Sequence, residues 1–338
     1  MAEPAVRDRD RAEVVTLGEC LVALVGAELG PLAEVGAFGR HVAGAEANVA
    51  VGLARLGHRA AFIGRVGADG FGTAIVRALR GAGVGIEWLA VDVAGPTGHL
   101  FRERRALGAA EVVYARAGSA GSRLGPEDVD AAAAGGAFDG ARWLHLTGIT
   151  PALSASCRAA VERTVDQARE RRMTISLDLN LRRKLWSVEE AGPALAALAA
   201  RCDVVLGDAD EAAIVTGNGE SGGQPSANPE LLDALLALGP ALAVIKLGAS
   251  GATARARDGE AVSRPGLAVT PVDPVGAGDA FCAGFIAARL EGADLAQALD
   301  AGNACGAAAV AAIGDQAGLP DAVELGRLLA GSPRDTIR

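Results

Sequence analysis

Apolar residues along the chain fall into short β-rich runs separated by helix-length segments. From about residue 140, the runs 143–148, 174–180, 202–207 and 242–248 alternate with segments rich in Ala, Leu, Arg and Glu. Strands of a parallel sheet are buried on both faces and read as continuous apolar runs, and helices connect them. The pattern therefore predicts an α/β fold with three layers, α/β/α, around a mostly parallel sheet.

The first part of the chain shows the same alternation with two interruptions. We expect a strand over 14–25, a helix over 44–57 and a strand over 60–67. Residues from about 26–43 and 92–118 carry short runs with turn residues and no helical period, and the second of these reads as a hairpin. We infer that the two segments form a small β-sheet lid beside the main sheet.

The ends of the chain depart from this pattern. Residues 1–12 are charged and have no apolar core, so we interpret them as a flexible tail and not as a signal peptide. Residues 331–338 are expected to form a C-terminal tail, and the composition of 221–229 predicts a surface loop. No linker or charge block divides residues 13–330, which we expect to form one domain.

Composition narrows the possible partners. The chain has 338 residues and a net charge of -9, which argues against a general nucleic-acid surface. No apolar run reaches the roughly 18 residues of a membrane span. The five cysteines have no CxxC pair, which favours free thiols in a reducing cytoplasm and gives no zinc site. These cysteines are Cys20, Cys157, Cys202, Cys282 and Cys305.

The stretch VDPVGAGDAFCAGF (272–285) places two carboxylates, Asp273 and Asp279, around a turn of glycine and alanine. Asp279 opens a segment with apolar residues at helical spacing. Bare amides at a helix N-terminus attract anions. We expect a phosphoryl cradle with Asp279 as the general base. The alternative is an ordinary aspartate at a helix N-terminus, where Asp is favoured anyway. The cradle residues are Gly276, Ala277 and Gly278.

Two other nucleotide motifs are disfavoured. The phosphate loop GxxxxGK[ST] is absent, which argues against a P-loop enzyme. A GxGxxG match occurs at Gly217, Gly219 and Gly222, but it follows an expected helix and leads into a loop. A dinucleotide fingerprint follows a strand and opens a helix. An oxidoreductase is therefore the least favoured function.

Together with this turn, three other stretches resemble the ribokinase or PfkB family of carbohydrate kinases. GRVGADGFGTAIVRALRGAGV (64–84) is similar to the N-terminal signature of the family, and residues 273–285 are similar to its C-terminal signature, with Pro274 where the family usually has Thr. LGDADEAAIVTG (206–217) and VIKLGASGA (244–252) are similar to two further family segments. The resemblance implies a ribokinase-like fold and a kinase that uses ATP and Mg²⁺.

The resemblance also implies roles for residues of the nucleotide site. Asp208 takes the place of the family's Asn in an Asn-x-x-Glu segment, and with Glu211 it could hold Mg²⁺ or its water shell. Lys246 could meet phosphate, although a lysine that caps a sheet edge in solvent is the alternative. The nucleotide-binding residues that follow from the resemblance are Lys246, Gly248, Gly251, Gly276, Gly278 and Asn303.

Within this family, the segments 42–57, 112–124 and 176–186 most resemble the 2-keto-3-deoxygluconate kinases, above all in the string DLNLRRKLW. One departure is that the lid segment 97–103 offers only Leu100 and Phe101 where relatives often have a further tyrosine. The resemblance implies ATP-dependent phosphorylation of this sugar acid to 2-keto-3-deoxy-6-phosphogluconate. The substrate-binding residues that it implies are Gly44, Asn48, Tyr114, Arg116, Arg182, Asp279 and Asp315.

The two arginines of this set favour an acidic substrate. Arg grips a carboxylate as a planar fork, whereas neutral sugars need neutral donors. Arg182 could instead pair with Asp178 or contact ATP phosphate, and Tyr114 could be ordinary strand filler.

Other functions remain open at this point: a kinase for a neutral sugar such as fructose or ribose, a nucleoside kinase, or a catalytically silent sugar-acid sensor. The amphipathic lid is too small to bury both faces, so we also expect a homodimer or a multiple of one.

Overall fold

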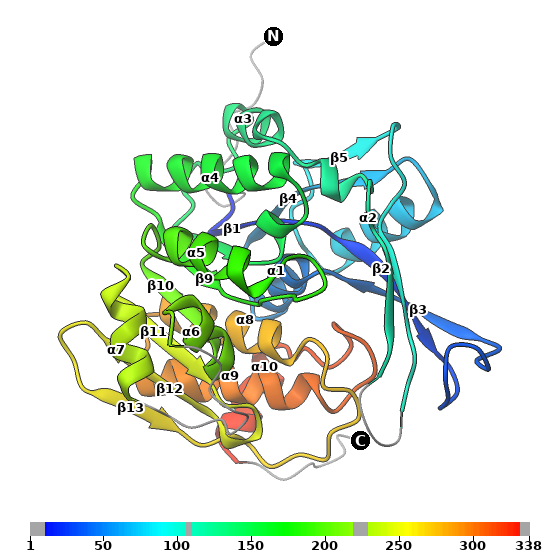
Figure 1. The fold of residues 1–338 in the computed structure, drawn as a ribbon. Helices are drawn as coiled ribbons and strands as arrows, with labels where there is room; N and C mark the ends of the chain where they lie inside the picture. The colour runs from blue at the N-terminus through cyan, green and yellow to red at the C-terminus, as the bar shows by residue number, and fades with distance from the viewer. Residues whose placement is uncertain (1–10, 106–109, 219–228, 332–338) are drawn as a thin grey trace. The chain divides into compact units, whose positions relative to one another are not determined.

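The computed structural model describes residues 11–105, 110–218 and 229–331. Most of the predicted tails and of the predicted loop 221–229 lie outside the described residues. The chain divides into two compact units. The first unit is Met1–Ala50 with Arg59–Ile175, and the second is Val51–His58 with Ser176–Arg338. Helix α1 (Ala45–Arg55) begins in the first unit and ends in the second (Figure 1).

Parallel strands in the order β8-β1-β4-β5 form the main sheet of the first unit. All four residues of β1 are buried, because β1 has a neighbouring strand on either side. Helices α2 and α3 contact β4, and α4 contacts β8. The bounds are β1 (Val14–Leu17), β4 (Ala60–Gly67), β5 (Leu89–Asp92), β8 (Trp143–Thr147), α2 (Gly70–Gly81), α3 (Pro126–Ala134) and α4 (Ala155–Glu170).

A second, smaller sheet in the first unit has the order β3-β2-β6-β7. β2 pairs antiparallel with β3 and parallel with β6, and β6 and β7 pair antiparallel as the predicted hairpin. These strands include both segments that the sequence assigned to the lid. They are β2 (Leu21–Gly26), β3 (Phe38–Ala43), β6 (His99–Arg102) and β7 (Val112–Ala115).

The prediction of one strand over residues 14–25 is wrong. The segment is two strands, β1 in the main sheet and β2 in the small one, with a break at Gly18, Glu19 and Cys20. Both strands are buried, so the apolar runs on the two sides of this short break resemble one strand. A Cβ at Gly18 would lie 2.4 Å from the carboxyl carbon of Glu46, so a larger residue would displace a carboxylate that Thr147 and Thr150 hold by hydrogen bonds.

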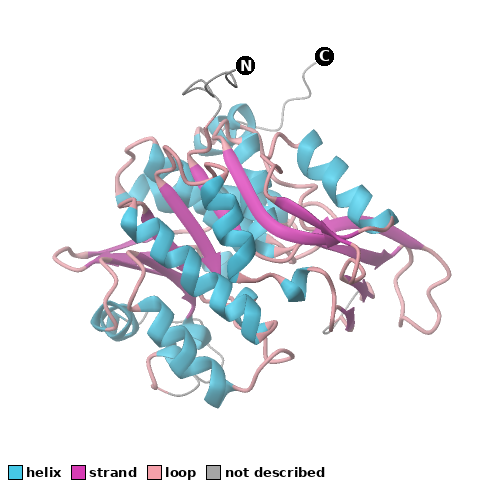
Figure 2. Cartoon of the chain, turned by 90° about the horizontal axis from the view of Figure 1, so that it is seen from above, coloured by secondary structure: helices cyan, strands magenta, loops and turns pink. Residues whose placement is uncertain are grey.

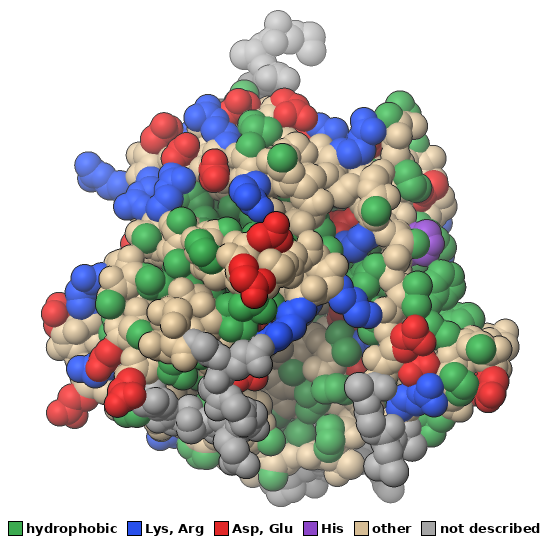
Figure 3. Space-filling view, in the orientation of Figure 1, with side chains coloured by type: hydrophobic (Ala, Val, Ile, Leu, Met, Phe, Trp, Pro, Cys, Tyr) green, Lys and Arg blue, Asp and Glu red, His purple; other side chains and the backbone are tan. Residues whose placement is uncertain are grey.

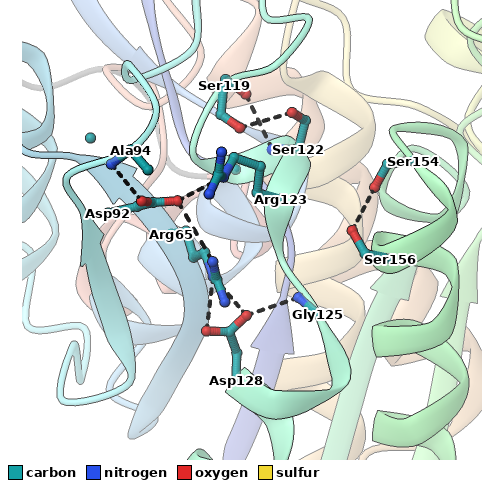
Figure 4. Close-up of polar contacts among 12 residues, drawn as sticks. Arg65, Asp92, Ala94, Ser119, Ser122, Arg123, Gly125, Asp128, Ser154 and Ser156 are labelled. Carbon is teal, nitrogen blue, oxygen red and sulfur yellow. Dashed lines mark hydrogen bonds and ion pairs between the residues drawn. The ribbon is translucent and has the colours of Figure 1, made fainter.

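An ionic network joins elements of the first unit (Figure 4). Arg65, on β4, donates from Nε to both carboxylate oxygens of Asp128 in α3 at 2.9 and 2.8 Å. Its Nη1 lies 3.6 Å from Asp92 of β5, which Arg123 approaches at 3.0 Å. The network connects β4, β5, α3 and the 3-10 turn η2 (Gly121–Arg123).

The sheet of the second unit has the order β13-β12-β11-β10-β9. β9, β10 and β11 are parallel, and β12 and β13 add an antiparallel edge. Helix α6 contacts β10, α7 contacts β11 and β12, and α9 contacts β12 and β13. Figure 2 shows helices alongside strands in the chain as a whole. The bounds are β9 (Thr174–Asp178), β10 (Val204–Asp208), β11 (Leu242–Lys246), β12 (Ala252–Ala256), β13 (Ala261–Arg264), α5 (Val188–Ala199), α6 (Ala209–Val215), α7 (Pro229–Ala237), α8 (Ala277–Leu290), α9 (Leu295–Ala309) and α10 (Ala322–Leu329).

The parallel strands of the second unit end together in polar residues. Asp178, Asp208 and Lys246 are the last residues of β9, β10 and β11, and Asp208 is the register partner of Lys246. Ligands of α/β sheets bind outside the carboxyl ends of the strands. The register therefore gathers the charged side chains at the edge where a site is expected.

Two further properties agree with the composition. The five cysteines are buried thiols that form no disulfide with one another. No described helix combines the length and the apolar character that a membrane span needs. On the face shown in Figure 3, acidic and basic side chains are interspersed.

Candidate active site

The N-terminus of α8 depends on glycine at its cap. Gly276 has a φ of 83°, in the left-handed region that glycine adopts without strain. A Cβ there would lie 2.8 Å from the carbonyl oxygen of Asp315. The first amides of an α-helix have no acceptor inside the helix, and the helix dipole adds partial positive charge. The first turn of α8 is therefore suited to an anion.

The two aspartates around this turn do different things. Asp273 accepts hydrogen bonds from the amides of Val275 at 3.2 Å and Gly314 at 3.0 Å, so it ties the turn to the segment after α9. Asp279 lies in the first turn of α8, with 8% of its surface exposed. One carboxylate therefore shapes the backbone, and the other lies next to the helix amides.

Asp279 belongs to a polar network that reaches the ends of β9 and β11. Asn180 Nδ2 lies 3.3 Å from Asp279 Oδ1 and 3.2 Å from Asp178 Oδ2. Lys246 Nζ donates to Asp178 Oδ1 at 2.6 Å. Asn180 has a φ of 39°, which is unusual for a residue other than glycine. In this conformation its side-chain amide lies between the two carboxylates.

The ion pair of this network is largely buried. Asp178 is fully buried, and the side chain of Lys246 is 15% exposed. Burial alone would lower the pKa of Lys246, but the Asp178 carboxylate raises it, so the lysine keeps its charge. A Cβ on Gly278 would lie 3.2 Å from Nζ. A fixed cation therefore stands beside the amides of α8.

A pocket of about 600 Å³ opens in the second unit beside these groups. Lys246 and Gly278 line it together with Phe281 and small residues of η4 (Gly248–Ser250) and α9. Asn303 donates to the carbonyls of Arg264 and Pro265 at 3.2 and 3.1 Å, which fixes one wall. The predicted residues Gly248 and Gly251 also line this pocket. Its small, mostly apolar walls admit a flat base.

Asp208 and Glu211 form the capping box of α6. Glu211 N donates to Asp208 Oδ1 at 2.8 Å, and Asp208 N donates to Glu211 Oε2 at 2.9 Å. Glu211 Oε1 also accepts the amide of Leu181 at 2.8 Å. Burial raises the pKa of Glu211 to about 7, which Lys246 opposes.

The two acids fit Mg²⁺ through its waters. Carboxylate oxygens are the ligands that Mg²⁺ prefers, and each keeps a second lone pair beside its amide hydrogen bond. Among the described residues, no group of three His, Cys, Asp or Glu side chains is placed to hold a metal directly. Asp208 and Glu211 therefore suit water-mediated contacts to a cation.

Four predicted substrate residues lie in the first unit. Tyr114, on β7, is 37% exposed, and the Arg116 guanidinium carbon lies 5.4 Å from its ring centroid. Gly44 has a φ of 132°, and a Cβ there would lie 2.4 Å from the carbonyl oxygen of Glu19. Asn48, in α1, is buried, and its backbone N–H donates to the carbonyl oxygen of Gly44 at 2.7 Å.

Three predicted substrate residues lie in the second unit, and Asp279 of α8, described above, is one of them. Arg182 is exposed and donates to the carbonyl of Leu181 at 3.3 Å. Its alternative partner Asp178 pairs with Lys246 instead. Asp315 is 8% exposed, and its backbone covers the cap residue Gly276.

The sequence did not single out three residues of these clusters. Asn180 bridges two carboxylates of the second unit, and in the first unit Glu19 accepts hydrogen bonds from both Arg116 and Ser119. Asn180 stands in the quoted string DLNLRR, so its position beside Asp178 was a usable signal. Glu19 was visible only as a lone acid between two apolar runs, which does not indicate what it binds.

Replacing Lys246 with methionine should destabilise the protein by about 3–5 kcal/mol, because it leaves the buried Asp178 carboxylate without its cation. Urea unfolding of both proteins measures this difference. The matched control is Lys184→Met, at the exposed second lysine, which should change stability by less than about 0.5 kcal/mol. Equal losses in the two variants, or none in Lys246→Met, would contradict the role of the ion pair.

Comparisons with known proteins give the family of the chain. Residues 11–322 match the pfkB family carbohydrate kinase model. The chain is 38% identical over 320 residues to a 2-dehydro-3-deoxygluconokinase of Thermoproteus tenax, a match that covers 94% of each chain.

Solved structures extend the match to the fold. The structure of a 2-dehydro-3-deoxygluconokinase from Thermotoga maritima has a TM-score of 0.88 and 28% identity, covering 95% of this chain and 100% of that one. A putative Ribokinase II from E. coli, in complex with ATP and Mg²⁺, has a TM-score of 0.84 and 27% identity, covering 95% and 99%. The predicted ribokinase-like fold is thus confirmed, and the chain belongs to the pfkB family of carbohydrate kinases.

Proposed function

We propose that the protein transfers the γ-phosphoryl group of ATP to 2-keto-3-deoxygluconate, also called 2-dehydro-3-deoxygluconate, and releases the 6-phospho product and ADP. The relatives named for this activity support the proposal. The observation that carries it is the position of Asp279, which is buried in the first turn of α8 directly after the Gly276–Gly278 amides.

Asp279 acts as the general base. Asn180 restrains one oxygen of the Asp279 carboxylate. The carboxylate takes the proton of the sugar hydroxyl as the hydroxyl oxygen attacks the γ-phosphorus. The bond from the γ-phosphorus to the bridging oxygen breaks, and ADP leaves. The amides of Gly276, Ala277 and Gly278 stabilise the charge on the transferred group.

The pocket beside α8 holds the nucleotide. Its mostly apolar wall, with Asn303, Gly248 and Gly251, accepts the base and ribose, and Lys246 faces the phosphates. Asp208 and Glu211 would hold the water shell of Mg²⁺, which when bound would neutralise charge on the ATP phosphates. Lys246 keeps its ion pair with Asp178, so its position is set before ATP binds.

The substrate residues that the resemblance implies divide between the two units. Gly44, Asn48, Tyr114 and Arg116 come from the first unit. Arg182, Asp279 and Asp315 come from the second. Arg116 and Arg182 bind the carboxylate, for which a planar guanidinium is well suited. A neutral sugar or a nucleoside has no carboxylate for these arginines to bind.

Asp279→Asn should reduce kcat for the sugar acid by about 10²-fold or more, because the amide cannot take the proton. Its affinity for ATP should stay near that of the wild type, because the helix amides and Lys246 remain. Steady-state kinetics and nucleotide titration measure the two effects. Asp273→Asn, at the aspartate that shapes the turn, is the matched comparison. Turnover of Asp279→Asn within a few-fold of wild type would remove Asp279 from the mechanism.

The small sheet is also expected to pair with a second copy. Phe38, Val113 and Tyr114 of its strands are 36, 45 and 37% exposed, which leaves apolar surface for a partner to cover. Light scattering at micromolar concentration should give the mass of a dimer or of a multiple of dimers. A clean monomer would refute this proposal.

A further inference from the structure

Glu19 is a buried acid that the proposed mechanism does not use. It lies in the break between β1 and β2, and 2% of its surface is exposed. Two glycines make room for its side chain. A Cβ at Gly98 would lie 2.5 Å from Glu19 Oε1, and one at Gly121 would lie 2.3 Å from its Cγ. Backbone from two other segments is therefore shaped around this one carboxylate.

The partners of Glu19 include the arginine proposed to bind the substrate. Arg116 donates from Nε to Glu19 Oε2 at 2.7 Å, and its Nη2 contacts the same oxygen. Ser119 Oγ donates to Oε1 at 2.6 Å. Ser119 is itself fixed, because Ser122 N donates to its Oγ at 3.2 Å and Ser122 Oγ donates to its carbonyl at 2.8 Å (Figure 4).

This arrangement leaves one edge of the guanidinium for a ligand. Arg116 has donors on three nitrogens, and Glu19 engages the edge made by Nε and Nη2. Among the described residues, Nη1 has no protein acceptor. The side chain of Arg116 is only 10% exposed, and the Tyr114 ring lies against it. The plane and the free edge of the guanidinium are thus set before a substrate arrives.

Charge alone does not explain why an acid sits here. Glu19 cancels the charge of Arg116 and so weakens its long-range attraction for any anion. What the pair gains is direction, because a planar acceptor can then make two parallel hydrogen bonds to the edge formed by Nη1 and Nη2. A carboxylate has that shape, whereas a single hydroxyl does not.

We infer that Glu19 is a positioning residue for substrate specificity: it fixes the guanidinium of Arg116, with Ser119 holding the other carboxylate oxygen, so that the kinase prefers a sugar acid to a neutral sugar. The inference rests on the proposed function, since it assumes that Arg116 meets the substrate carboxylate.

The test compares steady-state kinetics of wild type and Glu19→Gln with 2-keto-3-deoxygluconate, fructose and ATP. Glu19→Gln keeps the shape but loses the charge-assisted hydrogen bond to Arg116. The KM for the sugar acid should rise about tenfold or more, while kcat changes less and the KM for ATP is unchanged. Activity on fructose, if present, should not change.

A matched control separates positioning from general stability. Glu103 is also a buried glutamate beside the small sheet, and it accepts from Arg105 Nε at 2.7 Å. Glu103→Gln should leave the KM for the sugar acid within about twofold of wild type. An equal rise in both variants would overturn the inference, because it would show that any loss of a buried acid in this region has the same effect.

Coupling to Arg116 gives the sharpest result. If Glu19 acts through Arg116, the double variant Glu19→Gln with Arg116→Ala should have nearly the same KM for the sugar acid as Arg116→Ala alone. Equal effects of Glu19→Gln with and without Arg116 would overturn the inference.

A milder variant covers the case in which Glu19→Gln does not fold. Ser119→Ala removes a single hydrogen bond to Glu19 and should raise the KM for the sugar acid about two- to fivefold. In that case, no rise in Ser119→Ala overturns the inference. If the wild type does not phosphorylate the sugar acid, the proposed function itself is refuted. If the wild type does so but the KM effect of Glu19→Gln is not selective for the sugar acid, only the inference about Glu19 is refuted.

Discussion

The buried ion pair between Lys246 and Asp178 is the interaction on which the site in the second unit depends. The strands that end at these residues place an ammonium group and a carboxylate 2.6 Å apart at the carboxyl edge of the sheet. Asn180 extends the pair to Asp279 and separates two carboxylates that would otherwise repel each other. Without the lysine, this corner would hold uncompensated negative charge next to the position proposed for ATP phosphates.

Each unit uses the same device. A buried carboxylate holds a cation by one side and leaves another side of it toward the place where an anion is proposed to bind. Asp178 does this for Lys246, and Glu19 does it for Arg116. In both cases the acid reduces net positive charge and fixes geometry. Fixed donors lose little entropy on binding, so recognition and transition-state stabilisation both benefit.

Much of the fold was predictable because its signals are local. Apolar runs gave β4, β8, β9, β10 and β11, and the glycine turn before Asp279 gave the start of α8. The break after β1 was missed, because only Gly18, Glu19 and Cys20 separate two buried apolar strands. The partners of the site were also hidden, since Glu19 and Arg116 lie 97 residues apart and Asn180 and Asp279 lie 99 apart. Only the folded chain brings such residues together, and neither composition nor spacing reports it.

The central claim is that this pfkB family kinase phosphorylates a sugar acid in preference to a neutral sugar because of its two arginines, Arg116 and Arg182. A coupled assay of ADP release by the wild-type protein, with 2-keto-3-deoxygluconate and with fructose, tests it most directly. The account predicts that kcat/KM for the sugar acid exceeds that for fructose by about tenfold to a hundredfold. This factor corresponds to the free energy of one charge-assisted hydrogen bond. Equal values, or a preference for fructose, would contradict it.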